Sequence, residues 1–376
     1  MDLFNGNNGN EQIGIGDRNQ QIASYFDRLF EPDPDYYPVD LFYYDDRAQL
    51  SYNLWRLDRG FIRYYFDPLK ESFHASVTSI LSDQEPEKPW LRKWQTQMGG
   101  YEEAMDFMNM RGDYGTLAHM LFTEAPKLGQ LQTEKLEMAV RIFVRKNHLW
   151  FRDTRRWSDD LKNDLAGLFQ WWKDYEVVPI ATEVPILVPV WNPHTDRLHY
   201  IAAGTPDLVC TLNRYNYTDK TPKKDRKRVN AIIDFKTGRK GFWESHEIQA
   251  NIYKDAWNWN MDNKIADKRS SRSLHCTCCA NWAPTDSQGD KTTYKFKWQH
   301  TKESNEKFFN YVDNFMQDGR HEVSDVRDIT GTLKLGEDTS NNVVYRPAAE
   351  FMKERWEEYQ QQQEQKPQGG TKDESE

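Results

Sequence analysis

The chain changes from helical to strand-like patterning about halfway along its length, and this change most constrains its fold. Residues 133–147 and 158–172 carry apolar side chains at the spacing of amphipathic helices. Residues 177–190, 198–212 and 229–235 are instead rich in apolar and β-branched residues, which is typical of strands. Prolines in the first of these segments favour bends or edge positions. The order predicts helices followed by a β-sheet.

Further elements extend this pattern on both sides. Gly112 and Gly115 are expected to interrupt the helical run, with Thr116 as the N-cap of a new helix. The remaining predicted elements are helices at 90–97, 101–110, 243–259, 303–315 and 348–361, and strands at 274–282 and 292–298. The prediction is therefore an α/β core, a mixed β-sheet flanked by helices, with helical N-terminal additions.

Composition divides the chain into five regions. Residues 1–22 are Asn/Gly-rich and read as a flexible leader, and residues 23–74 as a cap of loops and short hairpins without a separate core. Residues 75–320 hold the predicted core, residues 321–362 an extension with one helix, and residues 363–376 a low-complexity tail that we expect to be disordered.

The overall composition is that of a soluble globular chain. Hydrophobic residues make up 38% of it and charged residues 29%, and no run approaches the roughly 20 apolar residues that span a bilayer. The four cysteines and the absence of an export pattern predict reduced thiols in a cytoplasm. The net charge of −9 does not exclude DNA, because local charge steers a polyanion. Lys223 and Lys224 belong to a basic loop at 213–228 that is either a DNA contact or a solvated surface.

Two charged residues end the most apolar predicted strand. Asp234 and Lys236 follow the run Ala231-Ile232-Ile233, and period-2 alternation directs both side chains to the same face. A buried carboxylate and a buried lysine are costly unless they pair or hold a metal. This segment alone is a weak signal, so its meaning depends on the rest of the chain.

A second carboxylate, Asp207, follows a Gly-Thr-Pro bend on the preceding strand. An aspartate at a bend often only caps a backbone group. Paired with Asp234, however, it offers two carboxylates that could share a divalent cation, and Mg²⁺ favours one or two carboxylates plus water and substrate phosphate. The Phe235 carbonyl would be an additional oxygen ligand, and Lys236 could orient or deprotonate the attacking water.

Four other residues are candidates with ordinary alternatives. Glu183 lies among apolar strand residues, although an edge-strand surface position explains it equally well. His119 follows the predicted helix start at Thr116, where backbone N–H groups could approach a phosphate, but a structural histidine is as reasonable. Gln249 and Tyr253 share one helix face at i, i+4 spacing, where both could meet a phosphate or base.

Taken in order, these segments resemble the RecB-like branch of the PD-(D/E)XK nuclease superfamily, which has a restriction-endonuclease-like core. The match consists of Gly-x-x-x-His, Glu, Pro-Asp, Asp-x-Lys and Gln-x-x-x-Tyr between Gly115 and Tyr253, and the resemblance covers roughly residues 75–300. It implies the following roles: Asp207, Asp234 and His119 in metal binding, Lys236 as the catalytic lysine, Glu183 as a further catalytic carboxylate, and Gln249 and Tyr253 in binding DNA and placing the active-site groups.

The implied activity is hydrolysis of DNA phosphodiester bonds with one or two Mg²⁺ or Mn²⁺ ions. Within this branch the segments favour an exonuclease of recombination, repair or phage DNA metabolism, whose partners would be DNA and a single-strand annealing or other recombination protein, with no membrane. The alternatives are an endonuclease of the junction-resolving, packaging or restriction type on the same core, and a non-catalytic DNA-binding scaffold.

Three cysteines, Cys276, Cys278 and Cys279, follow the predicted core, and some RecB-like nucleases hold an iron–sulfur cluster. No cysteine precedes the core here, and Cys-x-Cys-Cys is tighter than the usual cluster spacing. The alternation across residues 274–282 fits a buried strand in which cysteine serves as a small hydrophobic residue. We therefore do not expect a cluster.

Overall fold

The structure is a computed structural model that describes residues 43–319 apart from short gaps. The gaps are at 53, 60–61, 68–69, 71, 86–88, 129–132, 148, 218–219, 239–240, 267–271, 286–293 and 301–302. The predicted leader at 1–22, the helix at 348–361 and the tail at 363–376 lie outside the described residues, as does the first part of the cap region.

A five-stranded mixed sheet forms the centre of the fold, as the strand-like segments predict. Its order is β10 (Tyr294–Gln299), β9 (Cys278–Pro284), β8 (Arg228–Phe235), β7 (Leu208–Asn213) and β4 (Val178–Thr182). Strands β8 and β9 are parallel, and every other neighbouring pair is antiparallel. Because parallel neighbours need a crossover, the chain passes through helix α8 (Glu244–Asn263) between them.

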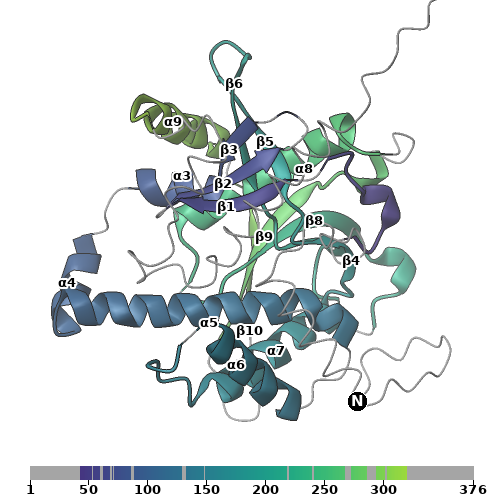
Figure 1. The fold of residues 1–376 in the computed structure, drawn as a ribbon. Coiled ribbons are helices and arrows are strands. Elements are labelled where there is room, and N and C mark those ends of the chain that lie inside the picture. Colours follow the sequence, from purple (N-terminus) through teal and green to yellow (C-terminus); the bar gives the residue numbers. More distant parts are fainter. Residues whose placement is uncertain are drawn as a thin grey trace, which may run out of the picture.

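The two faces of this sheet bury two separate hydrophobic clusters. Leu208 and Ile233 pack on one face with α5 (Tyr101–Leu128), α6 (Thr133–Lys146) and α7 (Trp157–Asp174). Val209 and Ile232, one residue along each strand, pack on the other face with α8, α3 (Val77–Gln84) and α9 (Ser304–Gln317). Figure 1 shows α5 to α7 on one side of the molecule and α3 and α9 on the other. Because helices cover both faces of the sheet, the side chains on both sides of β7, β8 and β9 are mostly buried. This explains why these strands read as nearly continuous apolar runs.

Two smaller sheets join the second cluster. Strands β1 (Trp55–Arg59), β2 (Ile62–Asp67) and β3 (Ser72–Ala75) form an antiparallel sheet, and β5 (Ile186–Trp191) pairs with β6 (Leu198–Gly204). Tyr64 and Phe66 of β2 are buried in the same cluster as Ile186 and Ile252. In its described part, this region therefore consists of short antiparallel strands that share the core of the main body.

The predicted strand segments at 177–190 and 198–212 each divide into two strands. The first divides after Thr182, so β4 stays in the central sheet while β5 leaves it. The second divides after Gly204, so β6 leaves and β7 returns. Glu183 and Asp207 lie at these two divisions, which are therefore the places where the chain changes sheets.

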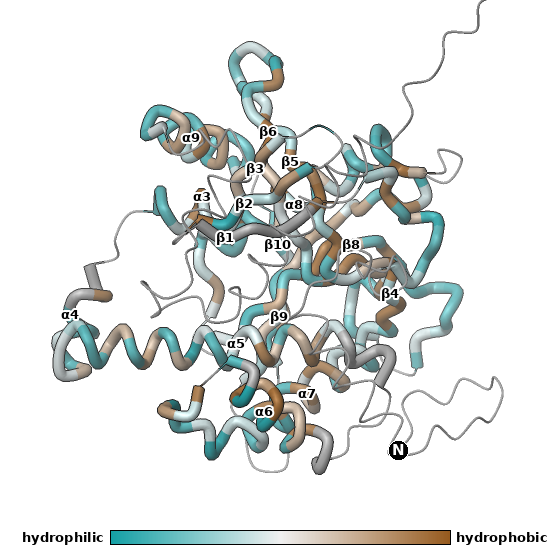
Figure 2. Tube along the Cα trace, in the orientation of Figure 1, coloured by the Kyte–Doolittle hydropathy of each residue, from teal (hydrophilic) through white to brown (hydrophobic). Residues whose placement is uncertain are grey.

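The prediction that Gly112 and Gly115 interrupt the helical run is wrong. Helix α5 continues through both for 28 residues, and its hydropathy alternates along its length in Figure 2. Each glycine costs the helix about 1 kcal/mol, but burial of Leu117 and Phe122 against the sheet offsets that cost. Thr116 is thus not an N-cap, and its hydroxyl donates to the Gly112 carbonyl within the helix at 3.1 Å. The structure has no helix start at Thr116 where a phosphate could bind.

Candidate metal centre

Strands β4 and β8 end, and strand β7 begins, at the same edge of the central sheet. Thr182 at the end of β4 pairs with Leu208 at the start of β7, and Leu208 pairs with Ile233 near the end of β8. Residues that follow β4, precede β7 and end β8 therefore come together. They are Glu183, Asp207 and the segment from Asp234 to Lys236.

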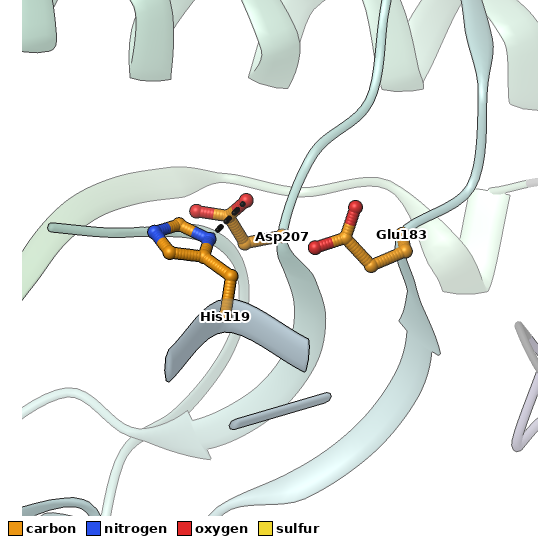
Figure 3. A group of neighbouring side chains, drawn as sticks. All are labelled: His119, Glu183 and Asp207. Carbon is orange, nitrogen blue, oxygen red and sulfur yellow. Dashed lines mark ion pairs between the residues drawn. The ribbon is translucent and has the colours of Figure 1, made fainter. Parts of the chain in front are cut away.

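His119, from the middle of α5, completes a group with Glu183 and Asp207 at this edge. Their ligand atoms, one imidazole nitrogen and two carboxylate oxygens, all lie within 4.8 Å of one another. Figure 3 shows the three side chains converging, with the Nδ1 atom of His119 3.4 Å from Oδ1 of Asp207. Within the described part of the chain, it is the only group of at least three His, Cys, Asp or Glu residues that could hold a metal. Such a mixed set fits Mn²⁺, and its carboxylates also fit Mg²⁺.

Backbone hydrogen bonds hold the Asp207 carboxylate and link the backbones of Asp207 and Glu183. The Phe235 N–H donates to Oδ2 of Asp207 at 2.5 Å, which turns the other oxygen toward His119. The Glu183 N–H donates to the Asp207 carbonyl at 3.2 Å. Glu183 has φ of 50°, a left-handed conformation that is uncommon for a residue other than glycine. Strain of this kind often marks functional sites, and here it accompanies the turn that brings Glu183 to the group.

The surroundings of His119 favour its protonated form in the absence of metal. Burial opposes a charged imidazole, but the carboxylates of Asp207 and Glu183 outweigh it and raise the pKa of His119 above its usual 6.5. The ring also contacts Phe122 and Phe235. Since a metal requires the neutral imidazole, protons and metal compete for this residue.

Asp234 and Lys236 form a second unit directly beside the group. The Lys236 Nζ atom donates to Oδ1 of Asp234 at 2.9 Å and to Oε1 of Gln249 at 3.0 Å. Oδ2 of Asp234 accepts a hydrogen bond of 2.6 Å from Asn281 on β9. Burial raises the pKa of Asp234 to about 6 despite the opposing attraction of Lys236, and the nearby Asp207 adds to the rise. Asp234 therefore holds Lys236 in place.

Gln249 and Tyr253, which we predicted as DNA-binding residues, are buried in the structure. Gln249 is 8% exposed and Tyr253 2%, so neither presents a surface to DNA. Gln249 accepts from Lys236, and its amide nitrogen lies 3.5 Å from the Tyr253 hydroxyl. The Tyr253 ring packs so closely on Gly204 that a Cβ there would lie 2.4 Å from it. Their contacts fit the other predicted role, that of placing the active-site groups.

Lys223 and Lys224 are not brought to this edge. They form the short helix η3 (Lys223–Asp225) in the loop between β7 and β8, at the opposite end of both strands. Both side chains are exposed. Their contact with DNA stays a prediction, and it would lie remote from the metal group. The Phe235 carbonyl as an oxygen ligand also stays a prediction.

Sequence reasoning missed Asn281. Its side chain is fully buried, donates to Asp234 and accepts from Gln299. The signal was present, since an asparagine between Ala280 and Trp282 in an apolar strand must find a partner. The four cysteines are free thiols, and Cys210, Cys276 and Cys279 are buried.

A scan against protein-family models and a search of curated proteins found no match to this chain. None of the helices in the described ranges is long and apolar enough to cross a membrane.

Proposed function

We propose that this protein is a metal-dependent deoxyribonuclease that hydrolyses phosphodiester bonds, with His119, Glu183 and Asp207 as metal ligands and Lys236 as the catalytic lysine. The observation that carries the proposal is the meeting of two units at one sheet edge. The three metal-ligand atoms lie within 4.8 Å of one another. The hydrogen bond from the Phe235 N–H to Asp207 links this group directly to the segment that carries Asp234 and Lys236.

The donor set suits the chemistry of phosphodiester cleavage. A divalent cation bound there would lower the pKa of a water nucleophile and stabilise the leaving oxygen. Lys236 is the group that would orient or deprotonate that water, or donate a hydrogen bond to a phosphate oxygen. Its direction is held by two acceptors, Asp234 and Gln249, and preorganised donors of this kind contribute strongly to catalysis.

The resemblance to the RecB-like branch of the PD-(D/E)XK nucleases supports an exonuclease of recombination, repair or phage DNA metabolism. All of its segments lie on elements that meet at the site, apart from the helix start expected at Thr116. We further propose DNA and a single-strand annealing or other recombination protein as partners. The free thiols agree with a cytoplasmic location.

A comparison of two substrates tests the proposal. End-labelled linear duplex and closed circular DNA are incubated with the protein and either Mn²⁺, Mg²⁺ or a chelator. We expect metal-dependent loss of the linear DNA and an intact circle. Nicking of the closed circle, which has no ends, would show that the activity is that of an endonuclease rather than an exonuclease. If both DNAs are bound but neither is cleaved under any metal condition, the protein is a scaffold and the proposal is wrong.

A further inference from the structure

A basic cavity lies at the opposite end of the central sheet from the metal group. It has a volume of about 880 Å³ and is walled by the first residues of β8, the loop before β9, the middle of α8 and the first turn of α9. Arg228 at the cavity and Asp234 beside the metal group are six residues apart on β8, which corresponds to roughly 20 Å. The cavity is therefore a separate site.

Cations dominate the charge of this cavity. Its walls include one carboxylate, Asp255, and five cationic side chains, which are Arg214, Lys227, Arg228, Lys254 and Arg272. Asp255 pairs with Lys254, and Arg228 pairs with Glu176. In the part of the chain that the structure describes, Arg214, Lys227 and Arg272 have no carboxylate partner. Three uncompensated cations around one hollow create a local positive field in a protein of net charge −9.

The surroundings of Arg214 favour an anion, such as a phosphate group, over a neutral ligand. Arg214 lies with its guanidinium 4.2 Å from the centre of the Trp298 ring, and its Nη2 lies 3.4 Å from Nε2 of His300, so the plane of this cation is fixed at the wall. One of its nitrogens, Nη1, is buried without a hydrogen-bond partner. Ser304 and Asn305 bring the first turn of α9 to the wall, but Glu303 at the N-cap and Glu306 already meet the positive end of this helix dipole, so the cations provide the attraction for an anion.

We propose that this cavity binds the phosphate groups of a nucleotide, either free or at the end of a nucleic-acid strand. The size of the cavity lies within the range of roughly 300–1,000 Å³ that small-molecule sites occupy. The amides of the wall are already engaged, since Asn230 donates to the Ser273 carbonyl and Asn305 to Asp255. Recognition therefore falls to the cations and the phosphates rather than to base edges.

Binding measured without metal tests this proposal independently of nuclease activity. Titration calorimetry in a chelator uses ATP, a short 5′-phosphorylated single strand, and adenosine as the ligand without phosphate. Arg272→Ala combined with Lys227→Ala should weaken binding by about tenfold or more, because each removes a charge-assisted hydrogen bond. Lys162→Ala combined with Lys173→Ala, two exposed residues of α7 on the other face, removes the same charge and should change nothing.

The two phosphorylated probes separate the sources of the ligand. Binding of ATP would indicate that the cavity binds a free nucleotide. Binding of the phosphorylated strand without binding of ATP would indicate that it binds the end of a strand. The proposal is overturned if neither probe binds saturably, if both double variants weaken binding equally, or if adenosine binds as well as ATP.

A second measurement needs no variant. Cys278 is a half-buried free thiol in the cavity wall, whereas the other cysteines are buried. Its labelling by a maleimide in the native protein should slow severalfold when the bound probe is present. An unchanged labelling rate at saturating probe would mean that the ligand binds elsewhere, and would reject this cavity as the site.

Discussion

The backbone N–H of Phe235 donates to the Asp207 carboxylate at 2.5 Å, and this bond joins the two halves of the candidate site. Asp207 belongs to the metal group, while Phe235 lies between Asp234 and Lys236. A shift of β8 by one residue would point Lys236 to the wrong face of the sheet and break the bond. The geometry of the metal ligands and that of the lysine therefore depend on one strand register.

Replacement of Glu183 should separate stability from metal binding. Glu183→Gly removes the positive φ at a non-glycine residue, but also the carboxylate that attracts protonated His119. Without metal, we therefore expect its free energy of unfolding to exceed that of Glu183→Gln, which loses the same charge, by about 1 kcal/mol. Mn²⁺ affinity should fall sharply. Glu183→Gln, which keeps the backbone strain, is the matched control. Denaturant unfolding and Mn²⁺ titration measure the two effects, and a glycine variant no more stable than Glu183→Gln would contradict the assignment of strain.

Metal affinity should depend on pH through His119. The carboxylates raise its pKa above 6.5, so a falling pH protonates the imidazole and excludes the metal. We expect Mn²⁺ binding measured by calorimetry to weaken steadily as the pH is lowered from about 8 to about 6. His119→Asn should bind Mn²⁺ more weakly and with a shallower pH dependence. The same slope in both proteins would show that His119 is not a ligand.

Replacement of Asn281 should shift the acidic side of the profile of cleavage rate against pH. Its amide donates to the ionised Asp234, which favours the charged carboxylate, so Asn281→Ala should raise the pKa of Asp234 above about 6. If Lys236 needs the Asp234 carboxylate, the pH at which activity reaches half its maximum should rise in this variant. Gln299→Ala removes the donor to Asn281 but leaves the bond from Asn281 to Asp234, so it should shift the profile less. A uniform loss of rate at every pH would instead indicate a purely structural role.

The contact between Gly204 and Tyr253 predicts a sensitive position outside the metal group. A methyl group at Gly204 would overlap the Tyr253 ring, and overpacking of this kind costs about 1–3 kcal/mol. Because Tyr253 supports Gln249, which holds Lys236, Gly204→Ala should lower both the melting temperature and the cleavage rate. Gly112→Ala, where a Cβ meets nothing within 4 Å, is the control and should stabilise α5 slightly. Equal effects at both positions would contradict this account.

The sequence predicted the elements better than the breaks between them. Apolar periodicity is a local property, so β8 and α8 lie close to their predicted limits. The prediction that α5 is interrupted was wrong because tertiary burial outweighed the low helix propensity of two glycines. Burial of Gln249 and Tyr253 and the bond from Asn281 to Asp234 depend on packing between segments far apart in the chain. No local pattern reports such contacts.

The most direct test of the central claim is the rate at which Lys236→Ala degrades end-labelled linear DNA with saturating Mn²⁺. Lys236 donates to Asp234 and Gln249 beside the metal group, so its loss should lower the rate at least about a hundredfold. Lys173→Ala, on an exposed face of α7, should cleave like the unaltered protein. DNA affinity and Mn²⁺ affinity should remain close to those of the unaltered protein. A Lys236→Ala variant with unchanged cleavage would contradict the assignment of this sheet edge as the catalytic site.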